Sequence, residues 1–124
     1  MEAFATSQVL QVEDLRVTFS APEGPLHAVD GVNLTVASGE TVALVGESGC
    51  GKTMTALAVL GLVPPEATVE GRIAFEGRDV RGLNPRDLRE LRGAGISMVF
   101  QEPVSSLNPV FRIGDQISDV IRAH

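Results

Sequence analysis

One eight-residue stretch, GESGCGKT at residues 46–53, restricts the possible folds of this chain more than any other feature. It fits the pattern GxxxxGK[ST], in which glycines let backbone amides approach a phosphate closely. The pattern requires a strand before it and a helix after it, because the positive end of the helix dipole adds to the attraction. TVALV at 41–45 is short, apolar and rich in β-branched residues, and 52–62 has apolar residues at helical spacing. The sequence therefore predicts a P-loop.

Each residue type in this loop has a physical role. Backbone amides from Gly49 to Thr53 can converge on a β-phosphate, Lys52 can reach the β- and γ-phosphates, and the Thr53 hydroxyl can complete a Mg²⁺ shell. Lys52 is accordingly a candidate catalytic residue and Thr53 a candidate metal ligand. The alternative is a glycine-rich turn that holds no ligand. The candidate nucleotide-binding residues of the loop are Gly46, Glu47, Ser48, Gly49, Cys50, Gly51, Lys52, Thr53 and Met54.

The other segments mix strands and helices along the chain. Period-two patterns such as Val32, Leu34 and Val36 predict strands, and a proline in the first turn together with amphipathic spacing predicts helices. The expected strands cover 9–19, 28–36, 41–45, 69–75 and 95–100, with a turn at 21–25 and helices at 52–62, 85–92 and 113–122. This order predicts an α/β protein.

Charge and cysteine content narrow the functional classes. The chain has 16 acidic and 10 basic residues and a net charge of −6, which argues against a dedicated nucleic-acid binder. Its single cysteine, Cys50, excludes an internal disulfide. The first residues lack the basic start and apolar stretch of a signal peptide, and no apolar run is long enough to span a bilayer.

A second group of residues, ISMVFQEPVSSLNPVFRIGDQI at 96–117, narrows the choice among P-loop proteins. Gln101 follows the predicted strand at 95–100, and ligands of open α/β sheets bind beyond the carboxyl ends of strands. Its amide could contact Mg²⁺ or orient a water molecule. A lone glutamine there is more often a solvated strand-end residue, but the accompanying P-loop favours a site residue.

Taken together, these motifs resemble the N-terminal half of an ABC-transporter ATPase, and within that family the dipeptide/oligopeptide/nickel importer subunits. The P-loop occurs in many families, whereas a glutamine loop followed by SSLNP is specific to a much smaller group of proteins. The resemblance runs from about Val9 to the end of the chain. It rests on GESGCGKT at 46–53, LVPP at 62–65, MVFQEPVSSLNP at 98–109 and IGDQI at 113–117.

The resemblance implies two further site residues. Gln101 matches the glutamine that contacts Mg²⁺ or the attacking water, so it is a candidate catalytic residue and metal ligand. The loop after it borders the surface that receives the membrane subunit. Phe19 matches the position of an aromatic side chain that stacks on adenine. Many family members have tyrosine there, and Phe19 could instead be an ordinary core residue.

The same resemblance implies a P-loop NTPase core with an N-terminal antiparallel β-subdomain. The expected division is about 9–40 for the β-subdomain, 41–102 for the P-loop core, and 103–124 for the glutamine loop and the start of a helical subdomain. The family's signature motif, Walker B carboxylates and switch histidine would come after residue 124. We therefore expect a partial nucleotide-binding domain that does not hydrolyse ATP by itself.

The function implied by the resemblance is ATP binding, with Mg²⁺, in an importer ATPase that powers uptake of peptides or nickel. Its expected partners are transmembrane permease subunits and a second ATPase subunit, identical or paralogous. Its expected location is the cytoplasmic face of the cell membrane, as a peripheral protein. Two alternatives are a P-loop NTPase unconnected with transport and a non-catalytic regulatory domain that binds nucleotide. A guanine-reading Asn-Lys-x-Asp motif, which would favour a GTPase, does not occur in the sequence.

Overall fold

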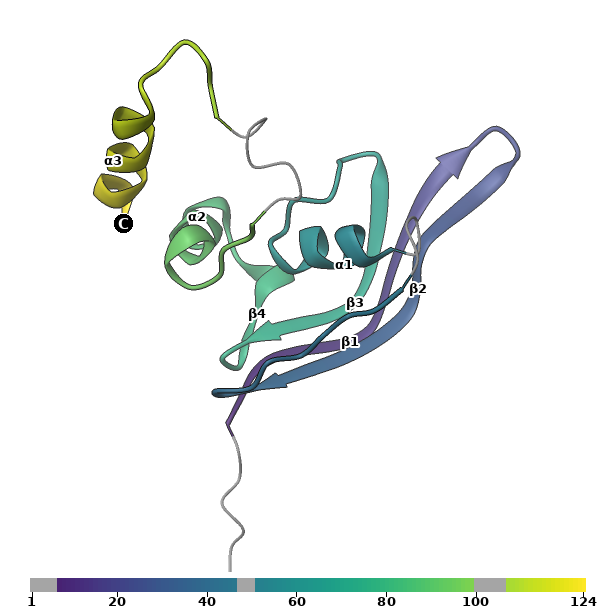
Figure 1. Ribbon diagram of the computed structural model, residues 1–124. Helices are drawn as coiled ribbons and strands as arrows, with labels where there is room; N and C mark the ends of the chain where they lie inside the picture. The colour runs from purple at the N-terminus through teal and green to yellow at the C-terminus, as the bar shows by residue number, and fades with distance from the viewer. Residues whose placement is uncertain (1–6, 47–50, 100–106) are drawn as a thin grey trace, which may run out of the picture. The chain divides into compact units, whose positions relative to one another are not determined.

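The computed structural model of the protein describes residues 7–46, 51–99 and 107–124 (Figure 1). The chain divides into two compact units, Met1–Leu83 and Asn84–His124. Of the elements in the described ranges, the first unit contains the β-strands and the helix that follows the glycine-rich loop, and the second unit contains two helices. The two units are described separately below.

The first unit is built on a four-stranded antiparallel sheet with the strand order β2-β1-β3-β4. This sheet confirms the predicted strands at 9–19, 28–36 and 69–75, and the turn at 21–25 joins the first two into a long hairpin. The elements of the unit are β1 (Gln8–Ala21), β2 (Gly24–Ala37), α1 (Lys52–Val59), β3 (Ala67–Phe75), β4 (Arg78–Asp79) and the short 3-10 helix η1 (Val80–Gly82).

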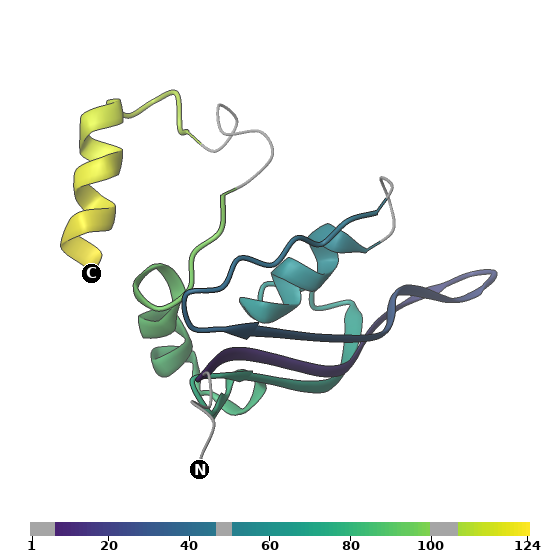
Figure 2. The same ribbon diagram turned by 60° about the horizontal axis from the view of Figure 1, so that its bottom comes forward.

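The core of this unit lies between one face of the sheet and α1, which crosses that face in both views (Figures 1 and 2). The helix buries Ala58 and Val59, and the next residue, Leu60, is buried as well. Removing these apolar side chains from water is the main force that holds a short helix on a sheet. The sheet contributes the buried residues Val12, Leu15, Val17, Val29 and Ile73. Ala74 is also buried, but it follows Ile73 in β3 and faces the opposite side of the sheet.

Two predicted strands are absent from the described part of the chain. Residues 41–46 are coil, and Val42, Leu44 and Val45 are 40%, 45% and 89% exposed, so the prediction of a buried strand at 41–45 is wrong here. At 95–100 the described residues form only an isolated bridge from Ile96 to Arg92, and Val99 is 92% exposed. A buried parallel strand needs ladder partners beside it, and no described strand pairs with either segment.

The second unit contains α2 (Pro85–Ala94) and α3 (Ile113–Ala123), which confirm the predicted helices at 85–92 and 113–122. Asn84 caps α2 by accepting a hydrogen bond from the Asp87 amide at 2.8 Å. The helical backbone of α2 is interrupted at Arg92 and Gly93, whose backbone dihedral angles are not helical. None of the helices in the described ranges is both long and apolar enough to cross a membrane.

Candidate functional site

The glycine-rich loop leads into α1 through Gly51, which is the N-cap of the helix. Gly51 has a φ of 94°, in the left-handed region that favours glycine. A Cβ atom at this position would overlap the backbone carbonyl oxygen of Ala28 in β2 and would lie 3.5 Å from Cγ2 of Val29. The end of the loop is therefore seated directly on the backbone of β2, and only glycine fits there.

The carbonyl oxygen of Gly51 is held by Thr55, one turn into the helix. It accepts hydrogen bonds from the Thr55 amide at 2.9 Å and from the Thr55 hydroxyl at 2.8 Å. Thr55 is 4% exposed, so its side chain is fixed within the protein. This arrangement directs the Gly51 carbonyl into the helix and fixes the position at which α1 begins.

Lys52 connects the two described ends of the loop. Its Nζ donates a hydrogen bond to the carbonyl oxygen of Gly46, on the other side of residues 47–50. The side chain is half-buried, and its end points to Gly46 rather than away along the helix. The ammonium group therefore lies beside the first residue of the glycine-rich motif.

The first turn of α1 fits an anion electrostatically. Among the residues that the structure describes, no side chain caps the helix, and its first turn contains no acidic residue. By contrast, Asn84 caps α2, and Asp87 lies in the first turn of that helix. The first amides of any helix lack intrahelical partners and carry a partial positive charge. With Lys52 alongside and the Thr53 hydroxyl exposed, these groups fit a phosphate and its magnesium ion.

Phe19 lies on β1 and is half-exposed. It pairs across the sheet with Leu26 of β2, and it follows Val17 on the same face of the strand. Val17 is buried and pairs with Val29, whose side chain would lie 3.5 Å from a Cβ added at Gly51. Phe19 therefore projects from the face of the sheet that carries the start of α1. On that face it is the next β1 side chain after Val17, which lies opposite the β2 residues that seat the loop.

The structure thus brings Gly46, Gly51 and Lys52 together at the start of α1, with Thr53 exposed and Met54 half-buried in the first turn. It places Phe19 on the adjoining strand β1. The remaining candidates lie outside the described residues: Glu47, Ser48, Gly49, Cys50 and Gln101.

Sequence reasoning missed two contributors to this site. Thr55 carries the hydroxyl that fixes the Gly51 carbonyl, and its position four residues after a helix-starting glycine could have suggested this. Ala28 contributes its backbone carbonyl oxygen as the seat for Gly51. No feature of the Ala28 side chain could have indicated that role.

In the second unit, the described part of the glutamine-loop motif is held together by Gln116 of α3. Its Oε1 accepts a hydrogen bond from the Asn108 amide at 2.9 Å. Its Nε2 donates to the carbonyl oxygens of Asn108 and Phe111, both at 3.0 Å. These bonds attach the segment before α3 to the helix. Leu107 and Val110 beside them are 41% and 82% exposed.

Comparisons with known proteins agree with the motifs. A family model described as "ABC transporter" matches residues 29–123. The oligopeptide transport ATP-binding protein OppD of Salmonella typhimurium is 46% identical over 116 residues, covering 94% of this chain. The OppD protein of Escherichia coli is 45% identical over 116 residues, also covering 94%. The dipeptide transport ATP-binding protein DppD of Bacillus subtilis is 43% identical over 119 residues, again covering 94%.

These relatives are much longer than the chain. The matches span 35%, 34% and 36% of the three proteins, so the chain corresponds to about a third of their length. The family match begins at residue 29, within β2, and includes the glycine-rich loop and α1.

Proposed function

Because this chain belongs to the ABC transporter family, we propose that it forms the ATP-binding part of a subunit that powers peptide import. The observation that carries the proposal is the loop geometry. Lys52 reaches back to Gly46, and Gly51 is seated on β2, so both described ends of the loop are fixed around one position. The relatives' names add the class of transported solute, peptides.

In this proposal the loop and the start of α1 bind the phosphates of ATP. The uncapped amides of the first turn donate to phosphate oxygens, and Lys52 neutralises charge on the β- and γ-phosphates. Thr53 supplies a hydroxyl ligand to Mg²⁺. When bound, Mg·ATP supplies the phosphoanhydride bond whose cleavage drives transport. Phe19 offers a ring face for stacking on adenine, and its place beside the loop seat supports this role.

Residues 101–117 would connect the nucleotide to the membrane subunits. Gln101 is proposed to sense the γ-phosphate and contact Mg²⁺ or the attacking water. The exposed apolar side chains of Leu107 and Val110 support a docking role for the following segment. Gln116 holds that segment on α3 so that it can move as one piece. We expect substitution of Leu107 or Val110 to impair assembly with a permease without changing ATP affinity.

The activity of a whole protein is part of the same proposal. We propose an ATP hydrolase that pairs with a second ATPase subunit and binds permease subunits at the cytoplasmic face of the membrane. The relatives extend well beyond the matched third, and Walker B carboxylates that hold Mg²⁺ could lie in that additional length. We expect residues 1–124 alone to bind ATP without appreciable turnover.

The proposal is tested by titrating Mg·ATP into the protein and its Lys52→Ala variant by calorimetry. Hydrogen bonds to charged groups contribute about 1.5–3 kcal/mol, so the variant should bind roughly 10- to 150-fold more weakly. Arg72→Gln is the matched control, because Arg72 is an exposed cation that pairs with Glu13 on the sheet. Equal affinities of the Lys52 variant and the control would refute the assignment of the loop.

A further inference from the structure

Strand β1 contains one extra residue, Asp14, relative to β3, because between Glu13 and Arg16 it advances three residues while β3 advances two. Between Val12 and Leu15 it likewise advances three while β2 advances two. Against β2 the extra residue is compensated at the next step, because between Leu15 and Arg16 β2 advances two residues, past Gly31, while β1 advances one. Asp14 has a φ of 47°, which is uncommon for a residue other than glycine. Asp14 therefore forms a β-bulge in the middle strand of three.

This bulge decides which side chains of β1 face the core. Val12 before it and Leu15 and Val17 after it are all buried, although strict alternation from Val12 would turn the latter two outward. Phe19 follows Leu15 and Val17 on the same face. The extra residue at Asp14 therefore puts Phe19 on the side of the sheet that carries α1 rather than on the opposite side.

The strands on both sides accommodate the bulge with glycines. Gly71 of β3 has a φ of 102°, and a Cβ there would overlap the Asp14 carbonyl oxygen and lie 2.7 Å from that of Glu13. Gly31 of β2 has a φ of 80°, and a Cβ there would lie 3.3 Å from Oδ1 of Asp14. The distortion is thus built into three adjacent strands.

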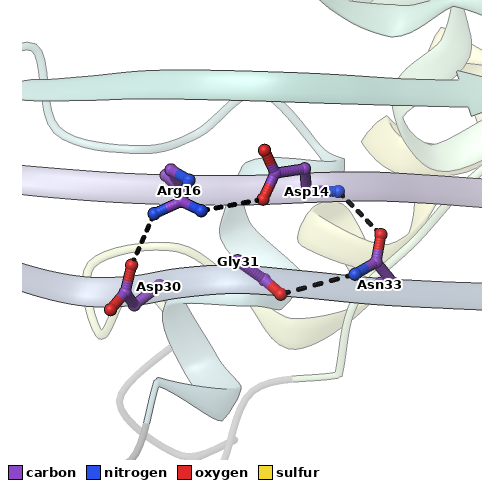
Figure 3. A network of polar contacts seen from close by, with 5 residues as sticks. All are labelled: Asp14, Arg16, Asp30, Gly31 and Asn33. Carbon is purple, nitrogen blue, oxygen red and sulfur yellow. Dashed lines mark hydrogen bonds and ion pairs between the residues drawn. The ribbon is translucent and has the colours of Figure 1, made fainter.

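Polar side chains of both β1 and β2 hold the bulge residue, and we call Arg16 of β1 and Asp30 and Asn33 of β2 the bulge clamp (Figure 3). The Arg16 guanidinium donates to Oδ1 of Asp14 at 3.1 Å and to Oδ1 of Asp30 at 2.8 Å. Oδ1 of Asn33 accepts a hydrogen bond from the Asp14 amide at 2.9 Å, and Nδ2 of Asn33 donates one to the Gly31 carbonyl oxygen at 3.5 Å. Both the backbone and the carboxylate of Asp14 are therefore held.

The clamp mainly fixes the local conformation of the bulge and adds little to the unfolding free energy of the whole protein. The side chains of Arg16, Asp14 and Asp30 are 45%, 65% and 64% exposed, and exposed ion pairs contribute little to folding. The hydrogen bond that Arg16 donates to Asp14 and the charges of Asp14 and Asp30 raise the pKa of Arg16. A single clamp substitution should therefore alter the bulge without unfolding the sheet.

We propose that the bulge clamp is a positioning element for the nucleobase. It holds the hairpin beyond the bulge so that Phe19 faces the base while Ala28, on the other strand of that hairpin, seats Gly51. The hairpin extends past the start of α1 in both views (Figures 1 and 2). Arg16 and Asn33 thus act through Phe19 and do not touch ATP. This inference rests on the proposed binding of ATP at the loop.

A tryptophan reporter can test the inference, since the chain contains no tryptophan. In a Phe19→Trp variant, ATP should quench the single fluorophore by stacking, whereas inorganic tripolyphosphate should bind with little quenching. Thr18→Trp, which places the indole on the opposite face of β1, should show no ATP-dependent change.

Two clamp substitutions, Arg16→Gln and Asn33→Ala, are then added separately to the Phe19→Trp protein. Each should reduce the ATP-dependent quenching by at least half and weaken ATP binding about threefold to tenfold, within the range that base stacking allows. The affinity for tripolyphosphate should not change. Arg72→Gln is the matched control, because it breaks the 3.6 Å pair with Glu13 between β3 and β1 and leaves the clamp intact.

Three results would overturn the inference while leaving ATP binding at the loop in place. The clamp variants could retain full quenching, they could lose tripolyphosphate and ATP affinity to the same extent, or the Phe19→Trp reporter could bind ATP without quenching. The second result would reveal a general structural role in place of base positioning. Failure of the unsubstituted protein to bind ATP would instead refute the proposed function, and the inference with it.

Discussion

Gly51→Ala perturbs the close approach of Gly51 to the backbone of β2, the contact on which the candidate site depends most. The new methyl group would meet the Ala28 carbonyl oxygen, and the residue would have to keep a φ of 94°. The left-handed conformation costs a non-glycine residue about 1–2 kcal/mol. Displacing a packed backbone group to make room adds about 1–3 kcal/mol. We therefore expect the variant to lose roughly 2–5 kcal/mol of unfolding free energy.

Gly39→Ala separates these two contributions. Gly39 also has a positive φ, 74°, but a Cβ there would meet nothing within 4 Å. It should therefore lose only the conformational part, about 1–2 kcal/mol. Urea unfolding followed by far-ultraviolet circular dichroism gives both values. Gly51→Ala should also weaken Mg·ATP binding, whereas Gly39→Ala should not. Equal destabilisation and unchanged ATP affinity in both variants would refute the claim that β2 seats the loop.

Three other substitutions probe the remaining parts of the site. Thr55→Val removes the buried hydroxyl that bonds the Gly51 carbonyl at 2.8 Å and should lower the unfolding free energy by about 0.5–1.5 kcal/mol in urea titrations. Thr53→Ala should weaken ATP binding in the presence of Mg²⁺ but not in EDTA, as measured by calorimetry; equal weakening in both would exclude a metal-ligand role. Gln101→Ala in a full-length subunit should leave ATP affinity nearly intact and lower permease-stimulated turnover; loss of ATP binding as complete as in Lys52→Ala would contradict its coupling role.

The sequence predicted elements whose signals are local. The strands around Val17, Val32 and Ile73 follow period-two patterns, and α1 starts at Lys52 as the loop motif requires. The failed predictions at 41–45 and 95–100 concern buried strands, whose existence depends on partners elsewhere in the sheet. An apolar run alone shows that a segment can be buried, but it does not show that a neighbouring strand is available.

The bulge clamp shows a different limit of sequence reasoning. The two consecutive polar residues Glu13 and Asp14, between buried Val12 and Leu15, interrupt the alternation and could have indicated a bulge. The hydrogen bond from the Asp14 amide to Asn33 could not be predicted, because it joins residues 19 positions apart in a specific register. The Gly46–Lys52 contact could be predicted only in part. The motif predicts that the lysine side chain belongs to the phosphate site, but it does not predict which carbonyl oxygen the lysine binds.

The central claim, that Lys52 faces the phosphates of bound ATP, has a direct test because Lys52 is the only lysine in the chain. Acetic anhydride acylates this side chain, and mass spectrometry resolves it from the N-terminus, so its acylation rate can be measured as a function of Mg·ATP concentration. If Lys52 faces the phosphates, Mg·ATP should slow acylation of Lys52 and leave acylation of the N-terminus unchanged, and the slowing should saturate at the Kd measured by calorimetry. An acylation rate at Lys52 that is the same with and without saturating Mg·ATP would contradict it.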